Sequence, residues 1–238
     1  RYLPDHDDVT TFTATAEDAT GDYIVLEGTY FYPEGGGQPA DRGRLEWDGG
    51  AAAVTDVQKE QGAVRHYIDE LEGALPAEGE TVKGEIDKER RQTLRRMHTA
   101  QHVVSKVVLD DFGAQTAGNQ IHTGTSRIDF KPATFSSADV EEIERRTNAL
   151  IDQDLPVVKE EMPRAQAEAE TPEGRGLLDL IPDHVDPLRM VAIGEFDLCP
   201  CGGTHVDRLG EVGHIRITNR TTKGADIDRI EFELTEAA

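Results

Sequence analysis

Two short segments of the chain each carry a pair of residues that can bind a metal ion. His98 and His102 are four positions apart, a spacing that puts both imidazoles on one face of a helix. Cys201 and His205 have the same spacing, and the two glycines between them allow a loop tight enough for both side chains to face inward. Three imidazoles and one thiolate make a tetrahedral set that suits Zn²⁺ better than Mg²⁺ or Ca²⁺.

These residues also have plainer interpretations. Two histidines at this spacing occur by chance as half-buried polar residues, Cys201 fits a small buried apolar side chain, and His205 fits a hydrogen-bonded loop residue. Cys199 is a rival thiolate, because together with Cys201 it would form a structural site with two sulfurs. The CxxxH spacing starts at Cys201, so we interpret Cys199 as a spare. Four protein ligands would close the coordination sphere, and the sequence leaves open whether such a zinc is structural or catalytic.

The elements that position these residues follow from the spacing of apolar residues. Short alternating runs between Val9 and about Lys83, separated by Gly, Asp and Pro, predict β-strands. One long helix is predicted from Asp87 to about Leu109, because its apolar residues recur near the 3.6-residue period. Both histidines of the first pair lie on this helix.

The rest of the chain mixes helices and strands. A capping pattern that begins at Ser136 predicts a second helix, which ends before Pro156, and a short helix is predicted after Pro163. Strands are predicted at residues 189–193, 214–218 and 230–234. We therefore place a boundary near Ile86, between an all-β unit and an α+β unit.

The charge of the chain is strongly negative. Its 238 residues include 25 Lys and Arg against 47 Asp and Glu, which gives a net charge of −22. Such a surface excludes a generic basic coat for nucleic acid or anionic lipid. The acidic residues are scattered, so we favour a halophilic protein adapted to a salty cytosol over an acidic protein that sequesters a basic partner. At molar salt the Debye length falls to roughly 3 Å, so a locally basic surface could still bind RNA.

The sequence carries no signal for a membrane or secreted location. Its two cysteines are separated by one residue, which is too close for an ordinary disulfide and indicates a reducing compartment. No apolar run approaches the roughly 20 residues of a transmembrane helix, and no charged-then-apolar leader opens the chain. We therefore expect a cytoplasmic protein without membrane contact and, because the chain starts at Arg1, a few further residues in front.

Several motifs follow one another in a set order. They are Met97 to His102, Ser126 to Phe130, Cys201 to Val206, Lys223-Gly224 and Arg229 to Phe232. In this order they resemble the editing domain of alanyl-tRNA synthetase and its free-standing relatives, the AlaX family of alanyl-tRNA editing proteins. The resemblance extends from about Glu85 to the C-terminus. The segment from Tyr32 to Gly43 is similar to the glycine-rich motif of the small β-barrel that precedes the editing domain in longer members. Its central residues are Gly35, Gly36, Gly37 and Gln38.

The resemblance implies a fold, an activity and a cofactor. The fold is α+β: a small N-terminal β-barrel over residues 1–85, followed by an α+β zinc-containing editing domain over 86–238. The activity is that of an aminoacyl-tRNA deacylase, a carboxylic ester hydrolase that removes a wrong amino acid, chiefly serine and in addition glycine, from tRNA(Ala). One Zn²⁺ per chain is held by His98, His102, Cys201 and His205. We expect the stand-alone, medium-length form without an obligate protein partner. Nucleotide or ATP binding is implied only by the resemblance to the wider family.

Two other functional classes fit the same residues. One is a zinc-containing hydrolase of small esters or amides that binds no RNA. The other is a non-catalytic tRNA-binding module in which zinc is structural. Hydrolysis of Ser-tRNA(Ala) compared with free esters separates the first class from an editing enzyme, and tRNA binding compared with turnover separates the second.

Candidate catalytic residues beside the metal are polar. Thr116, Asn119 and Gln120 lie in a predicted polar loop after the first helix, where the family has its substrate pocket, or they form an ordinary solvated turn. Gln101 points either into the same pocket or to solvent. The glycine-rich residues 35–38 form either a backbone nest that approaches RNA or the pocket, or a plain turn. No residue is assigned the chemical step.

Two regions with local positive charge are candidates for binding RNA. Basic residues exceed acidic ones between Lys83 and Lys106, and from this region we single out Arg91 and Arg95. The second region, near the C-terminus, contains Lys223 and Arg229. A solvated charged face is the alternative interpretation of both regions, and Arg127 with Asp129 fits an ordinary cross-strand pair.

Overall fold

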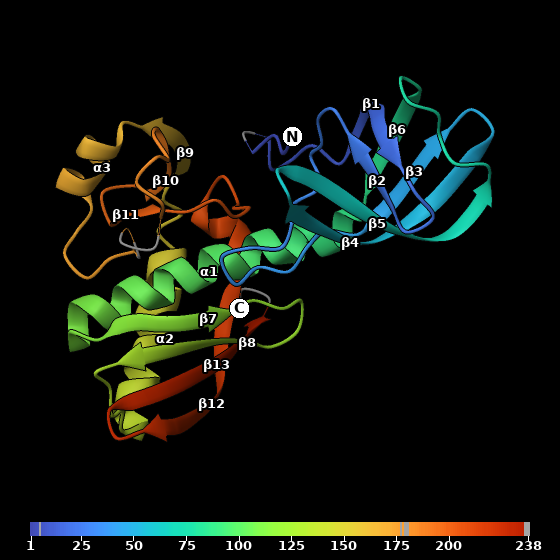
Figure 1. Ribbon diagram of the computed structural model, residues 1–238. Coiled ribbons are helices and arrows are strands. Elements are labelled where there is room, and N and C mark those ends of the chain that lie inside the picture. Colours follow the sequence, from blue (N-terminus) through green and yellow to red (C-terminus); the bar gives the residue numbers. More distant parts are fainter. Residues whose placement is uncertain (5, 177, 179–180, 236–238) are drawn as a thin grey trace. The chain divides into compact units, whose positions relative to one another are not determined.

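The structure is a computed structural model that describes residues 1–4, 6–176, 178 and 181–235 (Figure 1). The chain divides into two compact units, Arg1–Thr93 and Leu94–Ala238. The division falls inside helix α1 (Lys88–Phe112), a few residues beyond the predicted boundary at the end of strand β6 (Thr81–Ile86). Within the described residues, no helix is both long and apolar enough to cross a membrane.

The first unit contains a closed six-stranded antiparallel barrel, as the resemblance implied. Its strands lie in the order β1-β2-β5-β4-β3-β6. Their bounds are β1 (Thr11–Ala19), β2 (Tyr23–Leu26), β3 (Gly43–Trp47), β4 (Gly50–Glu60), β5 (Ala63–Gly73) and β6. Inward side chains such as Leu26, Leu45 and Val82 are fully buried, and β6 alternates strictly between exposed and buried residues. At Gly43 a Cβ atom would lie 2.0 Å from the carbonyl oxygen of Glu85, so only glycine fits where β3 meets β6.

The second unit is a mixed region of helices and two antiparallel sheets. One sheet has the order β12-β13-β8-β7 and the other β11-β10-β9. The elements after α1 are β7 (Gln115–Gln120), β8 (Ser126–Lys131), α2 (Ser137–Ile151), β9 (Val157–Met162), α3 (Arg164–Glu170), β10 (Leu188–Ile193), β11 (Asp197–Pro200), a short 3-10 helix (Leu209–Val212), β12 (His214–Gly224) and β13 (Ile227–Thr235). The predicted helix over 87–109 is therefore confirmed as α1, with Gly113 in a left-handed conformation directly after its end.

The core of the second unit forms between α1 and the larger sheet. The apolar face of α1 places Leu94, Met97 and Val104 in one buried cluster with Phe130 and Phe232. Strands β8 and β13 pair directly and alternate, so their inward residues reach this cluster while their outward residues are polar. The packing fixes the rotation of α1 about its axis, and this rotation determines where its two histidines point.

Two expectations about local structure have opposite outcomes. The capping box at the start of α2 is confirmed, because the Ser136 side chain accepts the Asp139 N–H and the Asp139 carboxylate accepts the Ser136 N–H. The loop predicted around Thr116, Asn119 and Gln120 is instead strand β7. This polar segment becomes a strand because its backbone pairs with β8, and it tolerates polar side chains because it is an edge of the sheet.

A fully buried histidine lies inside the barrel. His66 on β5 donates from Nδ1 to the carbonyl oxygen of Ile24 at 2.9 Å, because a carbonyl only accepts. Its Nε2 then accepts from the Thr29 hydroxyl at 2.8 Å. Burial lowers the pKa of His66 from 6.5 to about 4, so the imidazole is neutral at neutral pH.

We expect the free energy of unfolding to fall as the pH is lowered from 6.5 towards 4. In this interval the unfolded chain binds a proton at His66 and the folded chain does not, which costs up to about 3 kcal/mol of stability. Urea unfolding at pH 7 and pH 4.5 should therefore show a smaller loss for His66→Gln than for the unmodified chain. Equal losses would mean that another group controls acid stability.

Candidate metal centre

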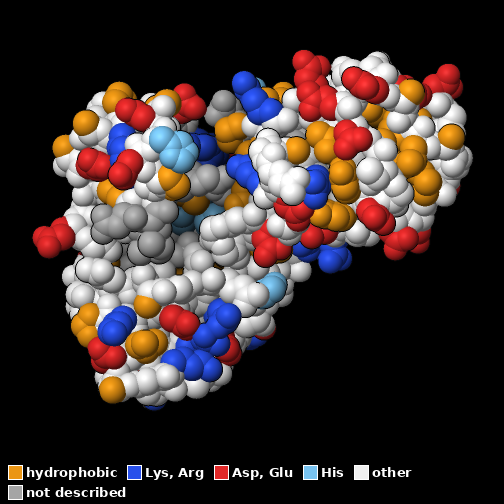
Figure 2. Space-filling view, in the orientation of Figure 1, with side chains coloured by type: hydrophobic (Ala, Val, Ile, Leu, Met, Phe, Trp, Pro, Cys, Tyr) orange, Lys and Arg blue, Asp and Glu red, His pale blue; other side chains and the backbone are white. Residues whose placement is uncertain are grey.

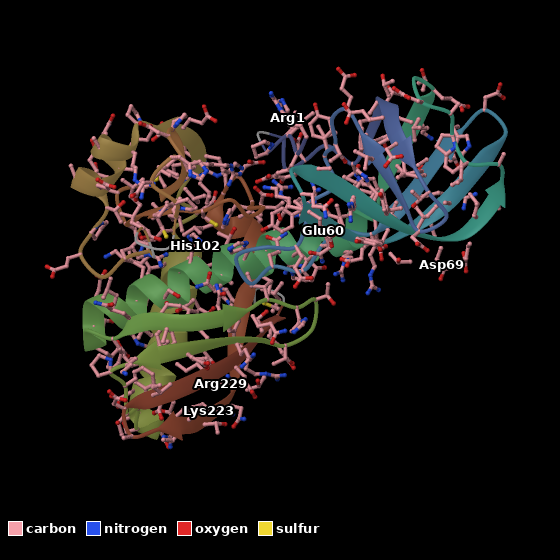
Figure 3. All side chains as sticks on the ribbon, viewed as in Figure 1. Arg1, Glu60, Asp69, His102, Lys223 and Arg229 are labelled. Carbon is pink, nitrogen blue, oxygen red and sulfur yellow. The ribbon has the colours of Figure 1, made fainter. Side chains whose placement is uncertain are left out.

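Helix α1 and the loop after β11 bring four potential ligands together. His98 and His102 project from one face of α1, and Cys201 and His205 lie in the loop. One ligand atom from each residue lies within 4.8 Å of all the others. The Cys201 sulfur is 3.5 Å from Nε2 of His98 and 3.3 Å from Nε2 of His205. Figure 3 marks His102 on the helix.

These distances suit a tetrahedral ion with mixed sulfur and nitrogen ligands. Zinc bonds of roughly 2.3 Å to sulfur and 2.0 Å to nitrogen place neighbouring ligand atoms about 3.5 Å apart. The three histidines are almost fully buried, and Cys201 is partly exposed. Burial first, and nearby positive charges second, lower the pKa of each imidazole well below 6.5. Each imidazole is therefore neutral at neutral pH, the form that binds metal.

The loop from Cys201 to His205 is held from several sides. The Arg189 guanidinium donates to the carbonyl oxygens of Cys201 and Gly203 at 2.8 and 2.9 Å. The Gly203 N–H donates to the Cys201 sulfur at 3.3 Å. Arg95 donates from Nε to the carbonyl oxygen of His205 at 2.7 Å. The loop is thus bonded to α1 and β10 before any ion binds.

A hydroxyl group on α1 sets the protonation of His205. Thr99 donates its proton to the carbonyl oxygen of Arg95 at 2.9 Å. Its oxygen is 3.1 Å from Nδ1 of His205 and therefore accepts the Nδ1–H. The lone pair of His205 is then on Nε2, the nitrogen that faces Cys201. Thr99 lies inside the HTAQH motif, but a threonine within a helix gives no sequence signal for this role.

The second cysteine lies outside this cluster. Among the described residues, the group that could hold a metal contains Cys201 and not Cys199. Cys199 is buried on β11, and burial raises the pKa of its thiol to about 12. A neutral thiol away from the other ligands agrees with its interpretation as a spare.

The four polar catalytic candidates are only partly brought together. Gln101 is buried and donates from Nε2 to the Ser105 hydroxyl at 2.8 Å, and Thr116 on β7 donates to the same hydroxyl at 2.9 Å. Gln120 accepts from Arg127 at 2.9 Å instead, and the cross-strand partner of Asp129 is Arg229. Asn119 lies on β7 opposite Ile128. Ser105, which links two of the candidates, was missed because a serine within a helix gives no particular signal.

The glycine-rich residues form a tight turn in the first unit. Gly35 and Gln38 exchange backbone hydrogen bonds of 2.9 and 3.1 Å, and Gly36 and Gly37 between them have φ values of +58° and +84°. Two successive positive φ values are those of a type I′ turn, which strongly favours glycine. The Gln38 side chain is buried, and Tyr32 donates its hydroxyl to the carbonyl oxygen of Gly35 at 2.8 Å.

Two of the four RNA-binding candidates are not surface residues. Arg91 is 2% exposed, binds the Asp41 carboxylate and donates to the carbonyl oxygens of Asp7 and Tyr30. Arg95 is 5% exposed and binds the His205 backbone. The expectation of an exposed basic face at these arginines is corrected, because their charges are used inside the two units.

The other two candidates lie on the larger sheet of the second unit (Figure 3). Lys223 on β12 is exposed, and Arg229 on β13 makes two bonds of 2.6 and 2.8 Å to the Asp129 carboxylate. The hydrogen bonds from Arg229, and then the charges of Arg229, Arg127 and Lys223, lower the pKa of Asp129. Three cations therefore surround one carboxylate, and Figure 2 shows basic side chains gathered over these strands.

Two families of aminoacyl-tRNA synthetase domains match parts of this chain. The family described as "Threonyl and Alanyl tRNA synthetase second additional domain" matches residues 188–231, which include Cys201 and His205. The family described as "tRNA synthetases class II (A)" matches residues 6–90, which include the barrel. The chain thus combines parts found in class II aminoacyl-tRNA synthetases.

Individual relatives narrow the class to a family. An alanyl-tRNA editing protein AlaX-M of Methanosarcina barkeri is 38% identical over 94% of both chains, and that of Methanosarcina acetivorans is 37% identical over 94% of both. The alanine–tRNA ligase of Methanopyrus kandleri is 42% identical over 91% of this chain, which spans only 23% of the ligase. The chain belongs to the AlaX-M family of alanyl-tRNA editing proteins.

Proposed function

We propose that this protein deacylates tRNA(Ala) that carries the wrong amino acid, chiefly serine and in addition glycine. The observation that carries the proposal is the cluster of three buried histidines and one cysteine in a chain of the AlaX-M family. An aminoacyl ester is already activated, so its hydrolysis requires a positioned water and groups that stabilise the developing negative charge. The name of the family supports tRNA(Ala) as the substrate, and the set of three imidazoles and one sulfur supports a hydrolase that uses a metal ion.

We propose one zinc ion per chain, bound by His98, His102, Cys201 and His205. The 3.3 and 3.5 Å separations of sulfur and nitrogen and the neutral imidazoles support this ligand set. When bound, zinc supplies a positive charge that can orient an ester oxygen or stabilise negative charge on it. Thr99 holds the lone pair of His205 on Nε2, and Arg189 keeps the loop around Cys201 in place.

Recognition of serine requires polar groups near its side chain. Serine differs from alanine by one hydroxyl, and a site that hydrogen-bonds this hydroxyl rejects alanine far better than an apolar pocket rejects serine. Gln101 is one helical turn from His98, and Ser105 links it to Thr116. We propose that these groups face the amino acid, with Asn119 and Gln120 further along β7.

The deciding experiment measures deacylation by the purified protein. Ser-tRNA(Ala) should be hydrolysed much faster than Ala-tRNA(Ala) and faster than a free serine ester at equal concentration. Equal rates on the free ester would favour the zinc-containing hydrolase of small esters. Tight tRNA binding without turnover would favour the non-catalytic module with structural zinc.

We also propose that the open face of the larger sheet contacts tRNA phosphates. Lys223, Arg229 and Arg127 surround Asp129, and Glu231 lies opposite Arg127, so at this point of the sheet three basic side chains face two acidic ones although the chain carries −22. For the glycine-rich residues 35–38 of the first unit we propose a separate role beside RNA or substrate. The N–H groups of Gly35 and Gln38 close the turn, so the backbone N–H groups of Gly36 and Gly37 would make this contact.

Charge reversal on this sheet should weaken tRNA binding. We expect Lys223→Glu to raise KM for Ser-tRNA(Ala) several-fold with kcat little changed, because a remote binding contact is lost. The dependence of log affinity on log salt should become less steep by about 1. Arg145→Glu is the control, since Arg145 is an exposed residue of α2 that pairs with Glu142. Equal effects in both variants would show a general charge effect and no phosphate contact at Lys223.

The net charge of −22 is proposed to be an adaptation to a salty cytoplasm. Acidic side chains are scattered over the visible face of the molecule (Figure 2). Their mutual repulsion extends further in dilute buffer, where the Debye length is longer. We expect the free energy of unfolding to rise as KCl is increased from 0.1 M to molar concentrations. Greatest stability in dilute buffer would contradict the adaptation.

A further inference from the structure

A buried ion pair lies beside the metal ligand His102. Arg175, in the segment between α3 and β10, donates from two nitrogens to the two carboxylate oxygens of Asp197 at 2.7 and 2.6 Å. The side chains of Arg175 and Asp197 are 6% and 0% exposed. The same guanidinium donates to the backbone carbonyl oxygen of His102 at 3.3 Å. Neither residue was singled out from the sequence.

One ring nitrogen of His102 is buried and unsatisfied. Within the described part of the chain, Nδ1 of His102 has no hydrogen-bond partner. An Asp197 carboxylate oxygen lies 3.9 Å away, which is about 1 Å longer than a hydrogen bond. Buried polar atoms are rarely left without a partner, so this arrangement calls for an explanation. With Nδ1 directed towards Asp197, Nε2 is the nitrogen that can serve the cluster.

We propose that Asp197 is a positioning residue for the metal site, with Arg175 holding it in place. When Nε2 of His102 binds the ion, Nδ1 carries the proton and donates it as a hydrogen bond to the Asp197 carboxylate. A carboxylate that accepts a hydrogen bond from the other ring nitrogen of a ligating histidine fixes the orientation of the ring and raises the basicity of the nitrogen that binds the ion. This inference rests on the proposed metal site.

The contacts favour this role over a purely structural ion pair. The pair approaches His102 at two points: an Asp197 oxygen lies 3.9 Å from Nδ1, and Arg175 donates to the backbone carbonyl oxygen at 3.3 Å. An ion pair that only stabilised the fold would not require either approach. His205 shows the corresponding arrangement already closed, with Thr99 accepting its Nδ1–H at 3.1 Å. Two of the three histidines thus have an oxygen acceptor within 4 Å of Nδ1.

The test compares two buried aspartates that have the same kind of partner. Asp197→Asn removes the charge beside His102, and Asp41→Asn removes the charge of an equally buried aspartate that pairs with Arg91 in the first unit. Zinc affinity of the full-length chain is measured by competition with a chelator, and stability by urea unfolding of the metal-free chain. Both variants should lose stability, but only Asp197→Asn should lose zinc affinity, by about 10–100-fold.

A double variant keeps the test decisive if Asp197→Asn does not fold. Arg175→Met with Asp197→Val removes both charges together, which a buried pair tolerates better than the loss of one partner. This variant should fold, bind zinc 10–100-fold more weakly, and show an altered visible spectrum when loaded with Co²⁺. Wild-type zinc affinity in either Asp197 variant, or an equal loss in Asp41→Asn, would overturn the inference. A wild-type chain that binds no zinc would overturn the metal site itself.

Discussion

Replacing Cys201 with alanine should abolish binding of the zinc ion that we propose and lower the deacylation of Ser-tRNA(Ala) by more than 100-fold. Loss of a group that only orients a ligand costs roughly 10–100-fold in metal affinity or activity, and loss of a ligand must cost more. Cys201 supplies the only sulfur of the cluster, and this sulfur accepts the Gly203 N–H. Metal content of the purified chain and single-turnover deacylation are the measurements.

The second cysteine provides a matched control for this prediction. Cys199 is two residues away and buried on β11, but it lies outside the cluster. We expect Cys199→Ala to retain about one zinc per chain and nearly full activity, with only a modest loss of stability from the small cavity. If Cys199→Ala loses its metal as completely as Cys201→Ala, the ligand set that we propose is wrong.

Replacing Arg91 with methionine should destabilise the first unit by about 3–5 kcal/mol. The substitution leaves the Asp41 carboxylate, which is 0% exposed, without its counter-charge. It also removes the donors to the carbonyl oxygens of Asp7 and Tyr30, two groups that are distant in the sequence. Urea unfolding followed by the fluorescence of Trp47, which packs in the barrel core, reports on this unit directly.

A half-buried arginine of the same barrel is the control for Arg91. Arg44 on β3 pairs with Glu46 and Glu72 at the surface, so Arg44→Met should change stability by no more than about 1 kcal/mol. The folded fraction of Arg91→Met should have the same KM for Ser-tRNA(Ala) as the unmodified chain. Wild-type stability together with a raised KM would instead return Arg91 to the role of a phosphate contact that the sequence suggested.

Features that depend on near neighbours along the chain could be predicted from the sequence. The HxxxH spacing needs only a helix to place two imidazoles on one face, and the apolar period of residues 87–109 predicts that helix. The capping box of Ser136 and Asp139 closes over three residues, so its signature is equally local. The family resemblance added the closed barrel, because it carries information about the whole fold.

Features that depend on distant residues required the tertiary structure. Arg91 and Arg95 look alike in the sequence, one helical turn apart in a basic segment. Arg91 is neutralised by a carboxylate 50 residues earlier, and Arg95 bonds to a carbonyl group 110 residues later. Similarly, polar β7 is a strand only because β8 lies alongside it, and Asp197 is near His102 only because β11 comes close to α1. Burial and pairing are set by which segments meet in space, and the spacing of residues along the chain does not carry that information.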